Sequence, residues 1–337
     1  MSDAYARAGV DLDAGAKAVA LIGDLARAAR RPEMREDLKG FAGLMDLGDG
    51  RLLAAGTDGV GTKLEIARQA GRLGTVGIDL VAMCADDVVC TGAEPLLFLD
   101  YLAVGAVDPE RVAAIVAGVA EGCRRANCAL LGGETAEHPG TMEPNAFDLA
   151  GFCVGIVRED ELLGAHRVRE GDALVGLASS GLHSNGYSLV RRAMLESGTF
   201  LLDETPEGLD RPLVDELLEP TTIYAPLVLD LAHGGLLRAA AHVTGGGIGE
   251  NLPRVFPDGL GAQVDETAWS PPPIVDLVRR AAEASADDMR ATFNMGVGMI
   301  LVVAPEDADR VAGLARAKGV PASTIGRVVP GSGVRYT

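Results

Sequence analysis

The segment from Gly56 to Lys63 holds residue types that are suited to phosphate chemistry. Asp58 can bind a hard cation through oxygen, and Lys63 can meet a phosphate as a point charge. The other polar and flexible residues can present hydroxyls and bare backbone N–H groups to an anion; they are Gly56, Thr57, Gly59, Gly61 and Thr62. The spacing fits neither the Walker A loop nor the dinucleotide fingerprint, so a glycine-rich turn after a hairpin is the alternative.

A second group of candidate ligands lies on a helix predicted over residues 75–90. Asp79 and Asp86 share one face of this helix, and Asp87 is turned from Asp86 by about 100°. Carboxylates on one face repel each other unless water screens them or a cation bridges them, and a solvated acidic face is the alternative. The segment is otherwise uncharged, which favours a cation. The opposite face is an apolar stripe, which we expect to be buried: Val81, Cys84, Ala85 and Val88.

Glu134 supplies a further carboxylate beside Gly132 and Gly133, which we expect to form a second glycine loop after a strand over residues 128–131. Ligand sites of α/β folds gather at the carboxyl ends of strands, so we predict phosphate binding by these two glycines. Mg²⁺ takes one or two carboxylates and keeps several waters. We therefore predict one or two Mg²⁺ ions that bridge a nucleotide's phosphates, with four ligands: Asp58, Asp79, Asp87 and Glu134.

Two loops in the second half combine glycine with hydroxyl or amide side chains. The loop 179–187 follows a predicted strand, and the segment 244–249 opens a predicted helix. Helix N-termini favour anions, whereas simple helix capping is the alternative for the serines. For His183 and His242 a structural role is the alternative to a chemical one. The predicted substrate-binding residues are Ser180, Gly181, Ser184, Asn185, Gly245, Gly246 and Gly247.

Length and composition indicate a two-domain α/β protein. The chain has 337 residues, 48% of them hydrophobic but only 4% aromatic, and single cores rarely exceed roughly 250–300 residues. The net charge of −18 argues against a general nucleic-acid or membrane-surface role. No apolar run reaches the ~18 residues of a membrane span, so we expect a cytoplasmic protein. The five cysteines show no C-x-x-C spacing, and we expect buried free thiols.

The elements that must position the candidate residues alternate along the chain. A first helix is expected over 14–30, capped by Asp13, with Val19, Ile22, Leu25 and Ala29 on its buried face. Asp108 and Pro109 begin another helix. A polar stretch at 158–172 separates the two predicted domains, 1–166 and 167–337. The remaining expected elements are a hairpin over 44–55, strands over 96–102, 147–157, 173–178, 297–303 and 322–329, and helices over 187–197, 274–284 and 306–318.

Taken together in their order and spacing, these segments resemble the phosphoribosylformylglycinamidine cyclo-ligase, or aminoimidazole ribonucleotide synthetase, family. The resemblance runs from end to end of the chain. It is carried by Tyr5 with Ala8 to Asp11 and Ala14-Gly15, Gly56 to Lys63, Gly77 to Asp79 with Ala82 to Cys84, Asp87 with Gly92 to Pro95, Leu131 to Glu137, Ser179 to Tyr187, His242 to Arg254, and Thr292 to Gly298.

The resemblance implies an ATP-dependent ring closure in purine biosynthesis. ATP would phosphorylate the formamide oxygen of formylglycinamidine ribonucleotide, after which the substrate's own nitrogen would close the imidazole ring and release phosphate. Such chemistry needs mainly positioning and charge neutralisation. We assign Lys63 and His183 as candidate catalytic residues, His183 in substrate placement rather than as an essential proton carrier. The resemblance further implies a homodimer whose N-terminal domains form a β-barrel, a C-terminal sheet covered by helices, and the use of Mg²⁺, with a monovalent cation left open.

Two departures from the family pattern limit which residue roles can be transferred from the family to this chain. Ala6-Arg7 stand where many relatives have a lysine, and Asp86 stands where many have asparagine, which leaves open whether Asp86 or Asp87 reaches the metal. Related enzymes that make selenophosphate, thiamine diphosphate or mature hydrogenase share acidic metal sites but not the segments 179–187 and 242–254. A catalytically silent nucleotide-binding partner is the alternative from a different class, and ATP binding without substrate-dependent ADP release would favour it.

Overall fold

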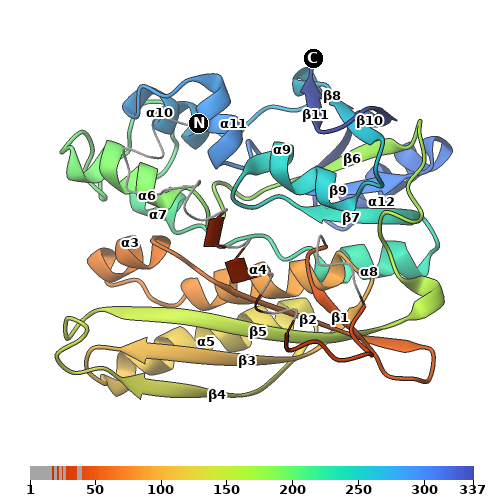
Figure 1. The fold of residues 1–337 in the computed structure, drawn as a ribbon. Helices are drawn as coiled ribbons and strands as arrows, with labels where there is room; N and C mark the ends of the chain where they lie inside the picture. The colour runs from red at the N-terminus through yellow and green to blue at the C-terminus, as the bar shows by residue number, and fades with distance from the viewer. Residues whose placement is uncertain (1–16, 19–20, 23–24, 26–27, 36–39) are drawn as a thin grey trace.

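The chain folds into two α/β domains, each built on its own sheet (Figure 1). The computed structural model describes residues 17–18, 21–22, 25, 28–35 and 40–337. Residues 17, 18, 21, 22 and 25 are helical, as predicted, whereas Asp13 and Val19 lie outside the described residues. The predicted burial of this helix is wrong at Ile22, Leu25 and Ala29, which are exposed because no described part of the chain packs over them.

The first domain is a five-stranded sheet with helices on one face. Its strand order is β1-β2-β5-β3-β4, and only the β3–β4 pair is parallel. Within the described residues this sheet is open, with β1 and β4 as its edges. Its elements are β1 (Gly43–Asp46), β2 (Arg51–Gly59), α3 (Lys63–Ala70), α4 (Val76–Val89), β3 (Glu94–Val104), α5 (Pro109–Ala126), β4 (Ala129–Glu137) and β5 (Phe147–Arg158).

Helix α4 is the central element of the molecule. Figure 1 shows it lying between the first sheet and the second domain. It packs on α5 and on β2 and β5 from its own domain, and on α8 and β7 from the second. Every residue from Val76 to Val89 except Asp87 is buried. The predicted apolar stripe is correct, but the opposite face is not open to solvent, because the second domain covers it.

The second domain is a six-stranded sheet in the order β11-β8-β10-β6-β9-β7, antiparallel except for the β11–β8 pair. Strand β9 is buried along its whole length. The strands are β6 (Ala173–Ala178), β7 (Leu237–His242), β8 (Leu260–Val264), β9 (Val297–Val303), β10 (Ala322–Pro330) and β11 (Val334–Tyr336). The helices are α6 (Tyr187–Val190), α7 (Leu213–Leu217), α8 (Ala225–His233), α9 (Gly247–Asn251), α10 (Pro273–Ala281), α11 (Ala286–Thr292) and α12 (Ala308–Ala317). Short 3₁₀ turns cover Glu159–Glu161, Leu252–Val255, Glu266–Ala268 and Pro305–Asp307, and a π-helical turn covers Arg191–Glu196.

Most predicted elements are confirmed, including the Asp108 cap, whose carboxylate accepts hydrogen bonds from two backbone N–H groups of α5. Two predictions about glycine segments are wrong. Gly56 to Gly59 belong to strand β2, so only residues 60–62 form a turn before α3. Gly132 and Gly133 lie inside strand β4 rather than in a loop. A side chain at Gly133 would clash with the buried carboxylate of Asp100 on the paired strand, which explains the glycine there.

The close contact of α4 with α5 yields a prediction about stability. A Cβ added at Gly77 would lie 2.2 Å from the backbone nitrogen of Val119. Gly77→Ala must therefore push two helices apart, and we expect a loss of about 3 kcal/mol in the free energy of unfolding, the upper end of the usual cost of overpacking. Urea denaturation measures it, with Gly74→Ala as the control, because a Cβ there meets nothing within 4 Å. Equal stability of the two variants would contradict the close packing.

Candidate active site

Lys63 and Asp79 form a fully buried ion pair where the two domains meet. The ammonium of Lys63, at the start of α3, lies 2.9 Å from Oδ1 of Asp79 on α4, and both side chains are 0% exposed. The same ammonium donates to the backbone oxygens of His183 at 2.9 Å and Glu219 at 2.7 Å. Asp79 Oδ1 also accepts from the backbone N–H and the hydroxyl of Thr221. All three ammonium donors are thus used, so in this conformation Lys63 joins the domains and does not face a phosphate.

The same network holds the predicted substrate loop 179–187. Ser180 donates its hydroxyl to the backbone oxygen of Pro220, and the hydroxyl of Ser184 lies 3.1 Å from that of Thr221. On the first-domain side, the hydroxyl of Thr62 lies 3.1 Å from that of Ser188. The turn at 60–62 and the loop 179–187, which are distant in sequence, are therefore brought together across the domain boundary.

His183 is buried within this loop with an unusual backbone. Its φ of 61° is left-handed, a strained conformation for a residue with a Cβ. Its Nε2 accepts the backbone N–H of Ser180, which places the imidazole proton on Nδ1, and Nδ1 has no partner in the described structure. Burial, followed by the charges of His242 and Lys63, holds the pKa of His183 well below its ordinary value. A neutral imidazole with one unused N–H donor results.

Asp58, Asp86, Asp87 and His242 form a second polar cluster, further along α4. His242, at the end of β7, has its Nδ1 2.9 Å from Oδ1 of Asp87. Burial alone lowers the pKa of His242, but the hydrogen bond and charge of Asp87, with Asp86 and Asp58, outweigh it and leave the pKa raised. Burial also raises the pKa of Asp58, and the nearby charge of Asp87 adds to this rise.

Asp86 and Asp87 have different surroundings. Both carboxylate oxygens of Asp86 accept the backbone N–H of Tyr224, at 2.9 and 3.1 Å, and the residue is 0% exposed. Burial raises its pKa from 3.8 to about 7. The side chain of Asp87 is 18% exposed. Asp87 is therefore the carboxylate that remains open to a ligand, whereas Asp86 is tied to the second domain.

The glycine segment 245–247 lies next to the loop 179–187. Asn251 on α9 donates to the backbone oxygens of Gly245 at 3.0 Å and Gly247 at 2.9 Å. The amide oxygen of Asn185 is 3.4 Å from where a Cβ of Gly245 would stand. The two predicted substrate-binding segments thus face each other within the second domain.

The four predicted metal ligands do not converge in the single chain. Asp58 and Asp87 are near neighbours, Asp79 is engaged with Lys63, and Glu134 lies on β4, three strands away from Asp58 in the sheet. Within the described residues, no three acidic, histidine or cysteine side chains are arranged to hold a metal ion. Asp58 and Asp87 nevertheless fit a cation, because the charge of Asp87 adds to the rise in the pKa of the partly buried Asp58 carboxyl, and a positive charge would relieve this repulsion.

The first sheet divides the remaining candidates between its two faces. Successive residues of a strand point to opposite faces, so half-buried Asp58 faces α4 while exposed Thr57 lies on the uncovered face opposite Phe152. Glu134 is exposed and pairs with Tyr101, which is also exposed, so both share that uncovered face. The predicted phosphate- and metal-binding set is thus distributed over two surfaces.

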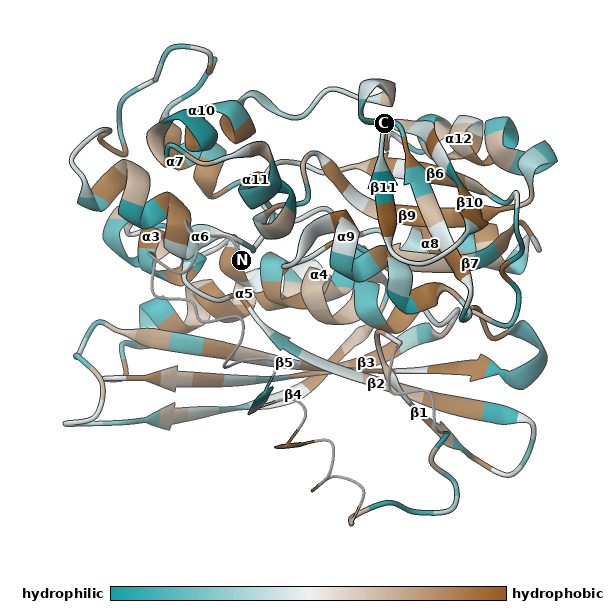
Figure 2. Ribbon diagram, turned by 45° about the horizontal axis from the view of Figure 1, so that its top comes forward, coloured by the Kyte–Doolittle hydropathy of each residue, from teal (hydrophilic) through white to brown (hydrophobic). Residues whose placement is uncertain are grey.

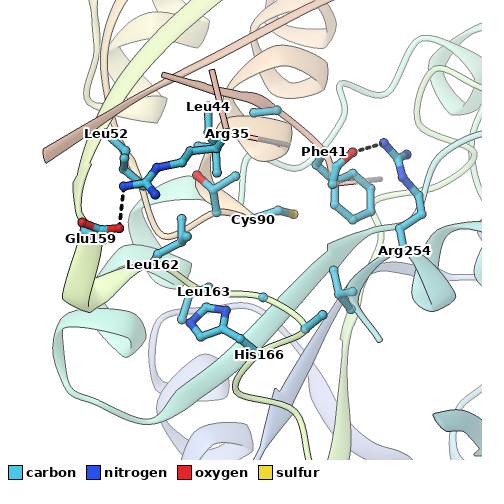
Figure 3. A pocket seen from close by; sticks show the side chains of 16 residues that line it. Arg35, Phe41, Leu44, Leu52, Cys90, Glu159, Leu162, Leu163, His166 and Arg254 are labelled. Atoms are coloured by element: carbon cyan, nitrogen blue, oxygen red, sulfur yellow. Dashed lines mark hydrogen bonds and ion pairs between the residues drawn. The ribbon is translucent and has the colours of Figure 1, made fainter. Parts of the chain in front are cut away.

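Two hollows border these clusters. A cavity of about 200 Å³ lies between the domains near the end of α4, and in Figure 3 Arg35, Phe41, His166 and Arg254 surround it. Arg35 pairs with Glu159 there, and Arg254 donates to the backbone oxygen of Gly40. A second hollow, of about 320 Å³, lies beside the first glycine turn and is lined by Gly61, Thr62, Leu64, Glu65, Arg68, Ala146, Phe147 and Asp148.

Comparison with known proteins identifies the family. Residues 40–157 match the family described as AIR synthase related protein, N-terminal domain, and residues 169–337 match the corresponding C-terminal domain. Phosphoribosylformylglycinamidine cyclo-ligase of Myxococcus xanthus is 51% identical, covering 99% of this chain and 98% of its own. That of Geobacillus kaustophilus is 48% identical, covering 100% and 98%. The chain belongs to the phosphoribosylformylglycinamidine cyclo-ligase family.

Solved structures share the fold of this cyclo-ligase family member. Thiamine-monophosphate kinase of Stenotrophomonas maltophilia superposes with a TM-score of 0.59 at 20% identity, covering 92% of this chain and 93% of its own. Thermotoga maritima PurL complexed with AMPPCP gives a TM-score of 0.57 at 17% identity, covering 87% of this chain and 43% of its own. No helix in the described part of the chain combines the length and the apolar character needed to cross a membrane.

The sequence analysis assigned no role to several residues that hold the candidate site together. Asn294, 2% exposed, donates to the backbone oxygen of Gly181 and accepts the backbone N–H of Gly296. Thr221 and Asn251 fix Asp79 and the glycine segment, as described above. The only sequence signal at Asn294 is a lone polar residue between apolar neighbours, which is also typical of ordinary loop residues.

The raised pKa of Asp86 predicts a pH-dependent stability. Because the folded-state pKa of about 7 exceeds the ordinary 3.8, the stability contribution is full below about pH 4 and is lost as the pH rises towards 7. Asp86→Asn keeps the site neutral at every pH. We therefore expect its free energy of unfolding to exceed that of the wild type by a difference that grows to a few kcal/mol between these pH values. Urea denaturation at several pH values measures this, with exposed Asp309→Asn as the control. Parallel pH profiles of wild type and Asp86→Asn would contradict the assignment.

Proposed function

We propose that this chain is an ATP-dependent cyclo-ligase that converts formylglycinamidine ribonucleotide to aminoimidazole ribonucleotide, with release of ADP and phosphate, in purine biosynthesis. The observation that carries the proposal is the full-length identity with relatives of that name, 51% and 48%. The geometry is compatible with it, because Thr62 of the phosphate-suited turn contacts Ser188, which follows the substrate-suited loop 179–187 directly, across the domain boundary.

The reaction needs activation of a poor leaving group. The formamide oxygen attacks the γ-phosphorus of ATP, so that an O–P bond forms and the bond to ADP breaks. The substrate's ring-closing nitrogen then attacks the activated carbon, loses its proton, and the C–O bond breaks to release phosphate. The protein's task is to position both substrates and to stabilise negative charge on the phosphates.

We propose that the ATP phosphates lie at the turn that follows β2. Thr62 and Gly61 line the 320 Å³ hollow there, and the backbone N–H groups near the start of α3 favour an anion. Proteins of the same fold have been solved with AMPPCP, namely PurL and AaThiL. Asp58 and Asp87 would hold Mg²⁺, which supplies charge neutralisation at the phosphates when bound. Dependence on a monovalent cation stays a prediction.

We propose that the substrate lies against the loops 179–187 and 245–247. His183 belongs to the first of these loops and is a neutral imidazole with an unused, buried Nδ1–H. As a neutral donor it would suit orientation of a substrate oxygen better than proton removal. Lys63 would act by holding the backbone oxygen of His183, and so the shape of the loop. Asp79, through its pairing with Lys63, would support the same loop rather than bind metal directly.

We also propose a cytoplasmic homodimer in which the uncovered face of the first sheet packs against its counterpart, as in the expected β-barrel. Leu99 and Phe152 are paired in register on this face and, with Tyr101, are 37–42% exposed in the single chain. Apolar side chains at strand positions without a covering layer favour association. Figure 2 shows hydrophobic stretches along β3 and β5, with α4 and α5 on the other face of the sheet. Glu134, on the same face, would then lie at the dimer interface together with Thr57.

The activity is tested by incubating the purified protein with ATP, Mg²⁺ and formylglycinamidine ribonucleotide. We expect aminoimidazole ribonucleotide and ADP in equal amounts, and no ADP when the ribonucleotide is omitted. ATP binding without substrate-dependent ADP release would instead show a catalytically silent nucleotide-binding protein.

The metal assignment yields a second test. Asp87→Asn keeps the shape of the side chain but removes a charge that would hold Mg²⁺, so we expect turnover to fall at least tenfold, about 1.4 kcal/mol of transition-state stabilisation. Kinetics over a Mg²⁺ titration measure the effect, with Asp309→Asn as an exposed control. Unchanged kinetics at every Mg²⁺ concentration would move the assignment away from Asp87.

The dimer is tested by light scattering at working enzyme concentration. We expect twice the chain mass of 34.8 kDa, and we expect Phe152→Lys to shift the protein towards monomer because it places a charge on the apolar face. Full activity at the mass of one chain would refute the homodimer.

A further inference from the structure

Cys123 and Cys128 lie at the C-terminal end of helix α5, at two positions whose side chains are brought together by the way the helix ends. Helix α5 ends at Ala126, and Asn127 adopts the left-handed conformation, with φ of 56° and ψ of 40°. The backbone N–H of Cys128 donates to the oxygen of Cys123 at 2.9 Å, and that of Asn127 donates to the oxygen of Arg124 at 3.3 Å. These two bonds define a Schellman motif, in which the residue before the last turn and the second residue after the helix contact each other.

The two thiols differ in exposure. Cys123 is 2% exposed and packs in the core, whereas Cys128 is only partly buried, at the start of the edge strand β4. The hydrogen bond from the Cys123 thiol lowers the pKa of Cys128, and the same bond, with burial, raises the pKa of Cys123. A partly exposed sulfur whose pKa is lowered therefore stands beside a buried thiol, the arrangement that favours an attacking and a resolving cysteine.

We propose that Cys123 and Cys128 form a redox-active dithiol, in which Cys128 reacts first with a peroxide and Cys123 then closes a reversible disulfide. The remaining cysteines are poor alternatives for the first step. Cys84, Cys90 and Cys153 are buried, and burial raises the pKa of each of their thiols. A thiol without thiolate character and without access to solvent reacts slowly with peroxide.

The two steps balance with hydrogen peroxide as the oxidant. The sulfur of Cys128 attacks one peroxide oxygen, the O–O bond breaks, and sulfenic acid and water form. The sulfur of Cys123 then attacks the sulfur of Cys128, the S–O bond breaks, and the departing hydroxide takes the thiol proton as a second water. Two thiols lose two electrons and two protons, and one peroxide is reduced to two waters. Because the Schellman bonds already hold the two residues together, we expect little movement of the backbone.

The position of two arginines makes the disulfide easy to detect. Arg124 and Arg125 lie between the cysteines, so trypsin separates them into two peptides that remain joined only if the disulfide is present. The full-length protein is treated with hydrogen peroxide, the remaining thiols are alkylated at low pH, and the tryptic peptides are measured by mass spectrometry. We expect the two peptides to be linked, with loss of two hydrogen atoms, and to be released by a reductant.

Variants distinguish the roles of the two thiols. In Cys123→Ser we expect Cys128 to remain as a sulfenic acid that dimedone traps. On longer exposure to peroxide without dimedone, Cys128 should become a sulfinic acid, with two oxygen atoms more than the thiol. In Cys128→Ser we expect Cys123 to stay reduced, and in Cys153→Ser, the control for a nearby buried thiol, the linked peptides should form as in the wild type. A Cys128–Cys153 link, or complete alkylation of both Cys123 and Cys128 in peroxide-treated wild type, would overturn the proposal. Because these two outcomes are measured on the wild-type protein, the test does not depend on whether the variants fold.

Discussion

The buried ion pair between Lys63 and Asp79 is the interaction on which the arrangement of the site depends. Both residues belong to the first domain, yet three of the groups they bind belong to the second: the backbone oxygens of His183 and Glu219, and Thr221. Removing one member of such a pair leaves a buried charge without a partner, which typically costs about 3–5 kcal/mol. The pair therefore fixes the position of the loop 179–187 relative to the turn after β2.

Helix α4 contacts the second domain at a further place along the domain boundary. One of its turns presents Asp79 to the ion pair, and two turns later Asp86 and Asp87 meet Tyr224 and His242 of the second domain. The helix thus has polar contacts with the second domain at two places while its apolar stripe packs on the first sheet. A rigid helix between two domains keeps the phosphate-suited and substrate-suited segments at a fixed separation, which is what a reaction that depends on positioning requires.

The sequence was sufficient for most of the fold, because hydrophobic periodicity and capping residues are local signals. Strands β6 and β9 and the start of α5 were predicted at or near their observed bounds for this reason. The predictions that failed concern residues whose surroundings are set by contacts between segments that are distant in sequence. For the second face of α4 the sequence left a cation site and a solvated acidic face as interpretations, because nothing local shows that a second domain covers it. Gly133 looked like a loop residue although it makes room for Asp100. The contacts of Lys63 and Thr221 across the domain boundary could not be inferred, because Lys63 binds the backbone of His183 and Glu219, 120 and 156 residues away, and Thr221 binds Asp79, 142 residues away.

The chemistry assigned to this site is that ATP activates the formamide oxygen by phosphorylation before the ring closes. The most direct measurement follows that oxygen through the reaction. Formylglycinamidine ribonucleotide labelled with ¹⁸O in the formyl group is converted with ATP in unlabelled water, and the phosphate is examined by mass spectrometry. We expect one ¹⁸O atom in each phosphate released, because the C–O bond breaks after the O–P bond has formed. Unlabelled phosphate, with the ¹⁸O found in water, would contradict it.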